Sequence, residues 1–172
     1  MIDRGLMKTS KLFLLLMLVF AAETLWHYPK LPDLLASHFD GAGRPNGWMP
    51  KPMFFGFNAG VMLLMFLIFG VMPRLLRNFP VSLINLPNKD YWLAESRREE
   101  SFGALAGYLN EIGAASMILI LAVTHLAIRA NLARAPLDSR TVWVLLAAFA
   151  AVTFIQIARM LLRFGRRPAD TR

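Results

Sequence analysis

The sequence predicts an all-α integral membrane protein with four transmembrane helices, an ordered extracytoplasmic loop and a cytoplasmic interfacial helix. Of the 172 residues, 56% are hydrophobic and 17% are charged, whereas a soluble domain is usually about 45–50% apolar and about 25% charged. The mean hydropathy is +0.47. Four apolar runs have about the length that a helix needs to cross a bilayer, and lysines and arginines gather at their ends, as is typical of membrane proteins.

The apolar runs form one polytopic domain that covers residues 1–172. We expect the spans at residues 11–28, 53–72, 111–129 and 141–162, with an outer loop at 29–52 and an inner loop at 73–103. Pro73 is expected to end the second span. Asp90 can cap a helix that begins amphipathically and lies at the membrane interface. The first run, after a basic lead, is also compatible with a cleavable signal peptide that ends at Val19-x-Ala21.

The positive charges predict the orientation of the chain. Of the 19 lysines and arginines, 13 flank the side that carries both termini and 6 flank the other side. The positive-inside rule then places both termini in the cytoplasm and the 29–52 loop outside. The net charge of +8 is explained by these topology signals and by contact with the lipid bilayer, so we expect no nucleic acid as a partner. The absence of cysteine excludes disulfides and thiolate sites.

The outer loop combines turn signals with large apolar residues. Asp40-Gly41 and Arg44-Pro45-Asn46-Gly47 each predict a turn. A flexible linker would not carry side chains such as Leu35, Phe39 and Trp48. We therefore expect an ordered cap on the membrane face, with Trp48 at the depth of the lipid headgroups.

Two short motifs lie in the outer and inner loops. The first contains Leu31-Pro32, His38-Phe39, Gly43, Pro45-Asn46-Gly47-Trp48 and Lys51, and the second contains Asn85-Leu-Pro-Asn-Lys-Asp-Tyr-Trp-Leu-Ala94 followed by Arg97-Arg98-Glu99. In these motifs the chain resembles a bacterial membrane-protein family of a domain of unknown function. That domain also forms the N-terminal part of immunity and signalling proteins against a sporulation-delaying protein toxin. The resemblance implies a multi-helix protein of the bacterial cytoplasmic (inner) membrane and implies little about mechanism.

The same motifs supply the residues that we expect to bind a ligand or a partner. They are His38, Phe39, Asp40, Trp48 and Lys51 in the outer loop, and Asn88, Asp90, Tyr91 and Trp92 in the inner loop. An extracellular peptide or envelope ligand would meet the first group, and a cytoplasmic regulator would meet the second. A homo-oligomer is also compatible with the sequence.

Polar side chains inside the spans each need an explanation, because an unpaired ionisable group in lipid is costly. Those in the outer half are Glu23, His27, Asn58 and His125, and those in the inner half are Glu111, Gln156 and Arg159. We predict two inward-facing polar clusters, with Glu111 paired to Arg159. The alternative is that these groups hold helices together or reach toward the headgroups.

Catalytic signatures are missing from the sequence. There is no HExxH motif, no serine nucleophile elbow and no phosphate-binding glycine loop. We therefore expect no enzymatic activity, no catalytic residue and no cofactor. The residues that come nearest to a metal-ligand set are His27, His38 and Asp40, with Glu23 one turn from His27, since three such ligands and an open position resemble catalytic zinc geometry.

These observations leave three functional hypotheses. The first is an immunity or signal-transduction protein that senses an external ligand. The second is a small transporter or channel component that uses Glu23, His27 and His125 as a proton or ion relay. The third is a metal-dependent membrane enzyme.

Overall fold

The computed structural model describes residues 4–166 of the chain. Arg167 and Arg172, which enter the orientation count above, lie outside this range, as does the start of the basic lead. The elements are α1 (Arg4–His27), η1 (Tyr28–Lys30), β1 (Leu34–Phe39), β2 (Pro45–Pro50), α2 (Lys51–Met65), η2 (Phe66–Val71), α3 (Met72–Leu75), η3 (Leu76–Asn78), η4 (Val81–Leu83), α4 (Lys89–Trp92), α5 (Arg98–Ala133) and α6 (Ser139–Gly165).

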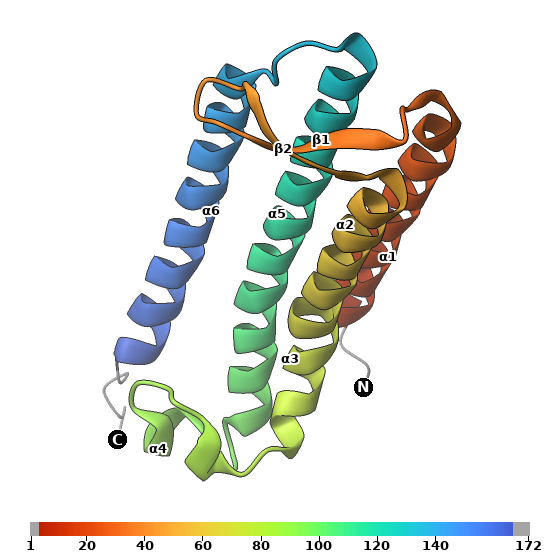
Figure 1. The fold of residues 1–172 in the computed structure, drawn as a ribbon. Helices are drawn as coiled ribbons and strands as arrows, with labels where there is room; N and C mark the ends of the chain where they lie inside the picture. Colours follow the sequence, from red (N-terminus) through yellow and green to blue (C-terminus); the bar gives the residue numbers. More distant parts are fainter. Residues whose placement is uncertain (1–3, 167–172) are drawn as a thin grey trace.

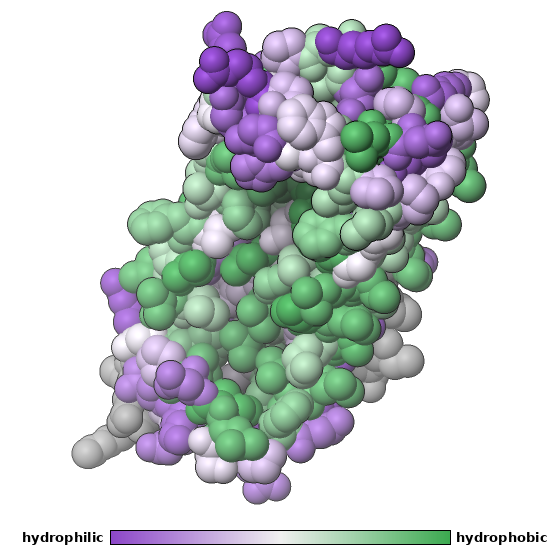
Figure 2. Space-filling view, viewed as in Figure 1, coloured by the Kyte–Doolittle hydropathy of each residue, from purple (hydrophilic) through white to green (hydrophobic). Residues whose placement is uncertain are grey.

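Four helical segments of the described chain are long and apolar enough to cross a membrane, which confirms the predicted fold class. They are Lys11–Lys30, Lys51–Asn78, Arg98–Ala133 and Ser139–Gly165. In the space-filling view, apolar residues cover the middle of the molecule and hydrophilic residues gather at its two ends (Figure 2). An apolar band between two polar ends is the surface that a bilayer solvates. The protein is a multi-pass membrane protein.

Helix α5 is the central element of the bundle. It packs against α1, α2 and α6, and Figure 1 shows it between α6 on one side and α1 with α2 on the other. With 36 residues it is roughly 54 Å long, so its ends extend beyond a hydrocarbon core of about 30 Å. We call the end of the bundle that carries β1 and β2 the hairpin end, and the opposite end the α4 end.

The second spanning helix continues past Pro73. Residues Phe66–Val71 form a π-helical segment, and Pro73 follows in the first turn of α3. Proline lacks the N–H that would bond four residues back, and its ring crowds that carbonyl, so a widened turn before it lets the helix continue. Our prediction that Pro73 ends the span was wrong. The widened turn packs closely on α5, where a Cβ at Gly113 would lie 2.1 Å from Cβ of Phe69.

The hairpin of β1 and β2 is an addition to the helical fold. The two strands are antiparallel and pair Leu35 with Met49 and Ala36 with Trp48. The register is irregular on both sides of His38, which is the signature of a β-bulge. The predicted turn at Arg44–Gly47 is therefore wrong, because Pro45–Pro50 is strand.

The buried side chains form clusters at successive depths of the described structure. At the hairpin end, one cluster joins the hairpin to α2 and α5 through Leu31, Leu35, Phe54, Phe55, Ala127 and Ile128. In the middle, the bundle is filled by Phe13, Leu16, Phe20, Met62 and Met117. At the α4 end, the inner loop is held by Ile84, Leu86, Leu93, Phe102 and Phe164.

The inner loop differs in detail from our expectation. The helix expected near Asp90 is α4, which is only four residues long and follows Asn88 in a left-handed conformation with φ of 52°. The acidic residues Glu99 and Glu100 lie in the first turn of α5. The amphipathic stretch is thus the start of the third spanning helix, because the chain from Arg98 onward continues without a break into the apolar run.

Candidate functional site

The tip of the hairpin is closed by Asp40. Its Oδ1 accepts hydrogen bonds from the backbone N–H groups of Ala42 at 3.0 Å and Arg44 at 2.8 Å, and its Oδ2 pairs with Nε of Arg44 at 2.8 Å. The backbone hydrogen bond from Arg44, followed by that from its side chain, holds the pKa of the Asp40 carboxyl below its ordinary value. The predicted turn at Asp40-Gly41 is confirmed. The hydrogen bonds of Asp40 therefore stabilise the turn at the hairpin tip.

Two tethers hold the hairpin on the bundle. Asn131 of α5 accepts from the N–H of Ala36 at 2.8 Å and donates to its carbonyl at 2.9 Å. At the tip, the N–H of Leu137 donates to the carbonyl of Gly43 at 2.8 Å. Neither contact was predicted from the sequence. Asn131 is a polar residue near the end of an apolar run, but nothing in the sequence identifies a partner 95 residues away.

Lys51 locks the base of the hairpin. Its Nζ donates to the carbonyl of Leu31 at 3.0 Å, lies 3.3 Å from Oδ1 of Asp33 and sits 4.8 Å from the ring centroid of Tyr28. The ammonium of Lys51 thus has three partners within the chain, a carbonyl oxygen, a carboxylate and an aromatic ring. Lys51, which we predicted to bind a ligand, therefore stabilises the base of the hairpin.

A cleft of about 320 Å³ opens between the hairpin and the end of α5. Its lining comprises Pro32, Leu34, Ala36, Phe39, Pro45, Trp48, Ala130, Asn131, Arg134, Ala135 and Pro136. Two of the predicted binding residues, Phe39 and Trp48, thus share one concave surface. Trp48 is 58% exposed, so a large apolar ring is available to a ligand. His38 is not among the lining residues, and its Nδ1 is hydrogen-bonded to Oδ1 of Asn46.

The predicted partner-binding residues of the inner loop lie at the α4 end and hold the end of α6. Asn88 Nδ2 and Trp92 Nε1 both donate to the carbonyl of Phe164 at 3.0 Å. That carbonyl is in the last turn of α6, where it has no partner within the helix. The guanidinium of Arg97 lies 4.0 Å from the ring centroid of Tyr91. Asp90 is exposed.

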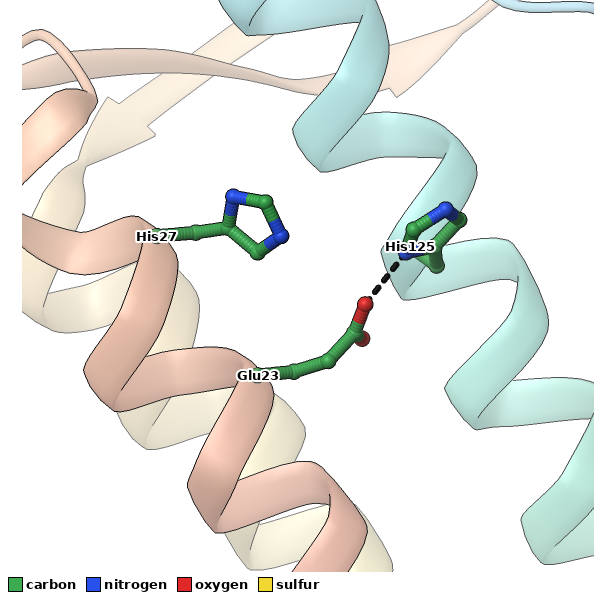
Figure 3. Close-up of side chains that lie close together, drawn as sticks. All are labelled: Glu23, His27 and His125. Carbon is green, nitrogen blue, oxygen red and sulfur yellow. Dashed lines mark hydrogen bonds and ion pairs between the residues drawn. The ribbon is translucent and has the colours of Figure 1, made fainter.

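A second concentration of polar groups lies inside the bundle, below the hairpin. The carboxylate of Glu23 and the ring of His27 come from neighbouring turns of α1, and the ring of His125 comes from α5 (Figure 3). Nδ1 of His125 is hydrogen-bonded to Oε1 of Glu23. The two histidine ring centroids are 6.3 Å apart. The structure thus assembles the three residues that we considered for an ion relay.

The other polar residues that we predicted inside the spans are paired between helices or within one helix. Thr124 of α5 donates to Oδ1 of Asn58 on α2 at 2.9 Å, which is the helix-joining role that polar residues take in membranes. Nη1 of Arg159 lies 3.6 Å from Oε2 of Glu111, the pairing that we predicted. The same Nη1 donates to Oε1 of Gln156 at 3.1 Å.

The predicted metal set of His27, His38 and Asp40 does not form one site. His38 and Asp40 make their own contacts in the hairpin, with Asn46 and Arg44. Among the described residues, the histidine and acidic side chains whose ligand atoms converge are Glu23, His27 and His125. The positions of these three residues along the spans predict the same depth, and the packing of α1 on α5 makes them neighbours.

Comparison with known proteins supports the family resemblance that the first motif indicates. No curated protein and no solved structure matches the chain. A family model described as a domain of unknown function (DUF1648) matches residues 12–63, which cover most of α1, the hairpin and most of α2. Over this segment, the chain is similar to a family whose function is itself unknown.

Proposed function

We propose that this chain is a receptor of the immunity and signal-transduction type in the bacterial cytoplasmic membrane, which binds an external peptide or envelope ligand and catalyses no reaction. The observation that carries the proposal is the cleft beside the hairpin. Binding sites are typically concave and mostly apolar, with a few polar groups that fix the orientation of the ligand. The cleft has this composition, with Trp48 and Phe39 as apolar surface and Arg134 as a positive charge.

The tethers of the hairpin make it a suitable platform for recognition. A binding surface loses less entropy when it is ordered before the ligand arrives. Asn131 fixes β1 on α5, and Leu137 fixes the tip on the loop before α6. A ligand in the cleft would contact residues of both the hairpin and the end of α5, so its binding can bias their relative position.

Helix α6 offers a physical route from the cleft to the other end of the bundle. Its first residue, Ser139, follows the loop whose Leu137 bonds the hairpin tip. Its last turn receives the hydrogen bonds of Asn88 and Trp92. A shift of α6 would therefore move the carbonyl that Asn88 and Trp92 bind. It would change the conformation of the second motif, where we propose that a cytoplasmic regulator binds.

A challenge experiment tests the proposal with the sporulation-delaying peptide toxin that the resemblance suggests as a probe. Sensitive cells that express the chain should survive better than cells with an empty vector. Replacing Trp48 with alanine should remove most of the protection, because truncating a central aromatic anchor costs about 2 kcal/mol, or roughly 30-fold in affinity.

Trp143→Ala is the matched control, since Trp143 is 62% exposed but does not line the cleft. It should protect like the original chain when both variants are expressed equally in the membrane. The proposal fails if the original chain protects no better than the empty vector, or if both tryptophan variants protect equally.

The relay hypothesis has less support from the packing. A relay through Glu23, His27 and His125 would have to continue through the middle of the bundle, where the buried side chains of Phe13, Phe20 and Met117 form a cluster. Protons and ions need polar groups or water along their path, and this cluster is apolar. The metal-dependent enzyme is the least supported hypothesis, because the sequence lacks the HExxH motif, the serine nucleophile elbow and the phosphate-binding glycine loop.

A further inference from the structure

The side chains of Glu23, His27 and His125 converge in the space between α1 and α5. One ligand atom from each residue lies within 4.8 Å of the other two. Figure 3 shows the carboxylate of Glu23 pointing toward the ring of His125, with the ring of His27 beside them. Glu23 and His27 are four residues apart on one helix and therefore share a face.

Interhelical hydrogen bonding explains only part of this arrangement. The bond between Oε1 of Glu23 and Nδ1 of His125 joins α1 to α5. It leaves Oε2 of Glu23 and Nδ1 of His27 buried without a hydrogen-bond partner. Unpaired polar atoms within a membrane span are costly, so a contact that satisfies both atoms would stabilise the bundle.

We propose that Glu23, His27 and His125 bind a divalent transition-metal ion, with zinc the best match to the donors. Two imidazoles and one carboxylate with an open fourth position are an established zinc ligand set. Ligand atoms around a tetrahedral zinc ion are roughly 3.4 Å apart, so small side-chain rotations from the present positions complete the site. Calcium and magnesium prefer oxygen ligands and are disfavoured by the two imidazoles.

The metal cluster lies toward the hairpin end of the bundle. His27 is the last residue of α1, so the cluster lies near the end of the helix. The side chain of His125 is 43% exposed and that of Glu23 is 20% exposed. None of the three residues lines the proposed ligand cleft, so a failure of the metal site and a failure of the receptor function can be told apart.

Metal titration of the purified full-length chain in lipid nanodiscs tests the proposal. After chelator treatment, the protein is titrated with Co²⁺, whose visible absorption reports the ligand geometry, and then with Zn²⁺. We expect saturable binding of a single Co²⁺ ion per chain with the spectrum of a tetrahedral or five-coordinate site. Zn²⁺ should displace the Co²⁺ and bleach the spectrum.

His27→Ala is the decisive variant. If the cluster only joins helices, His27 is dispensable, because the bond that joins α1 to α5 uses Glu23 and His125. If the cluster binds metal, losing one of three protein ligands should weaken binding by more than the roughly 10–100-fold that the loss of an outer-shell partner costs. His125→Ala and Glu23→Gln should weaken binding to a similar extent.

The chain contains three histidines, so His38→Ala is the matched control and should bind metal like the original protein. Gel filtration establishes that each variant is monodisperse before titration. The proposal is overturned if the original protein binds no stoichiometric Co²⁺ or Zn²⁺, or if His27→Ala binds them unchanged. A loss in His38→Ala that equals the loss in His27→Ala would also overturn it.

Discussion

Single residues at the hairpin end of the bundle determine whether the hairpin forms its cap. Gly43 has φ of +81°, and a Cβ built on it would lie 2.1 Å from the carbonyl oxygen of Leu137. The position therefore requires glycine for two independent reasons, the backbone conformation and the close approach of the loop before α6. Asp40 supplies the turn on one side, and Asn131 supplies the tether on β1.

Replacing Gly43 with alanine should detach the hairpin tip from the bundle. The left-handed backbone and the clash together should cost about 1–3 kcal/mol, because the hydrogen bond from Leu137 cannot form without backbone movement. Thermal unfolding of the detergent-solubilised protein, together with limited proteolysis of residues 40–45, measures the effect.

Gly41→Ala is the control for this experiment, because a Cβ at Gly41 meets nothing within 4 Å and the residue lies in the same turn. It should unfold within a few degrees of the original protein. Equal destabilisation by the two alanines would show that the close approach of Leu137 does not matter.

At the scale of secondary structure, ion pairs join α5 and α6 toward the α4 end. Glu111 pairs with Arg159 at 3.6 Å, and Glu100 pairs with Arg163 at 2.8 Å. The second pair lies at the helix ends, in the first turn of α5 and the last turn of α6, where water weakens its attraction. The Glu111–Arg159 pair lies deeper, where an unpaired charge is more costly.

Charge reversal at the deeper pair should show this difference. Glu111→Arg and Arg159→Glu should each lower membrane expression and thermal stability, and the double variant should recover more than half of the loss. Recovery should be incomplete, because Arg159 also bonds Gln156. Fluorescence-detected size exclusion of tagged protein measures both quantities.

The equivalent reversal at Glu100 and Arg163 serves as the comparison and should have smaller effects in the single variants. A double variant at Glu111 and Arg159 that is no better than the worse single variant would refute the pairing.

For the molecule as a whole, the surrounding bilayer explains why so many apolar side chains lie on the surface. Side chains such as Leu25, Phe57, Phe154 and Leu162 are each more than half exposed, which a soluble protein of this size avoids. In lipid, the same side chains face the surrounding hydrocarbon. The spans also separate the hairpin from α4, since these elements lie at opposite ends of the bundle (Figure 1).

Cysteine labelling tests the predicted orientation. The chain has no cysteine, so Ala42→Cys in the hairpin turn and Ser96→Cys before α5 each introduce a unique thiol at an exposed position. In intact cells, a membrane-impermeant maleimide should label position 42 and leave position 96 unlabelled until the cells are lysed. Labelling of both thiols in intact cells would contradict the four-span topology, and labelling of position 96 alone would reverse its orientation.

The sequence by itself determined the four spanning helices, because hydropathy over about 20 residues is a local property. It also predicted the Asp40 turn and the depth of each intramembrane polar residue, since both depend on spacing along the chain. It did not reveal the hairpin, because β2 begins and ends with proline and β1 is positioned by Asn131 from a distant helix.

Only the tertiary structure decided which polar residues meet. Glu23 and His125 are 102 residues apart, and the packing of α1 on α5 makes them neighbours with His27. Likewise, the sequence could not show that Lys51, Asn88 and Trp92 bond within the chain, or that Trp48 lines a cleft. Side-chain partners depend on how helices pack, which hydropathy and spacing along one segment do not specify.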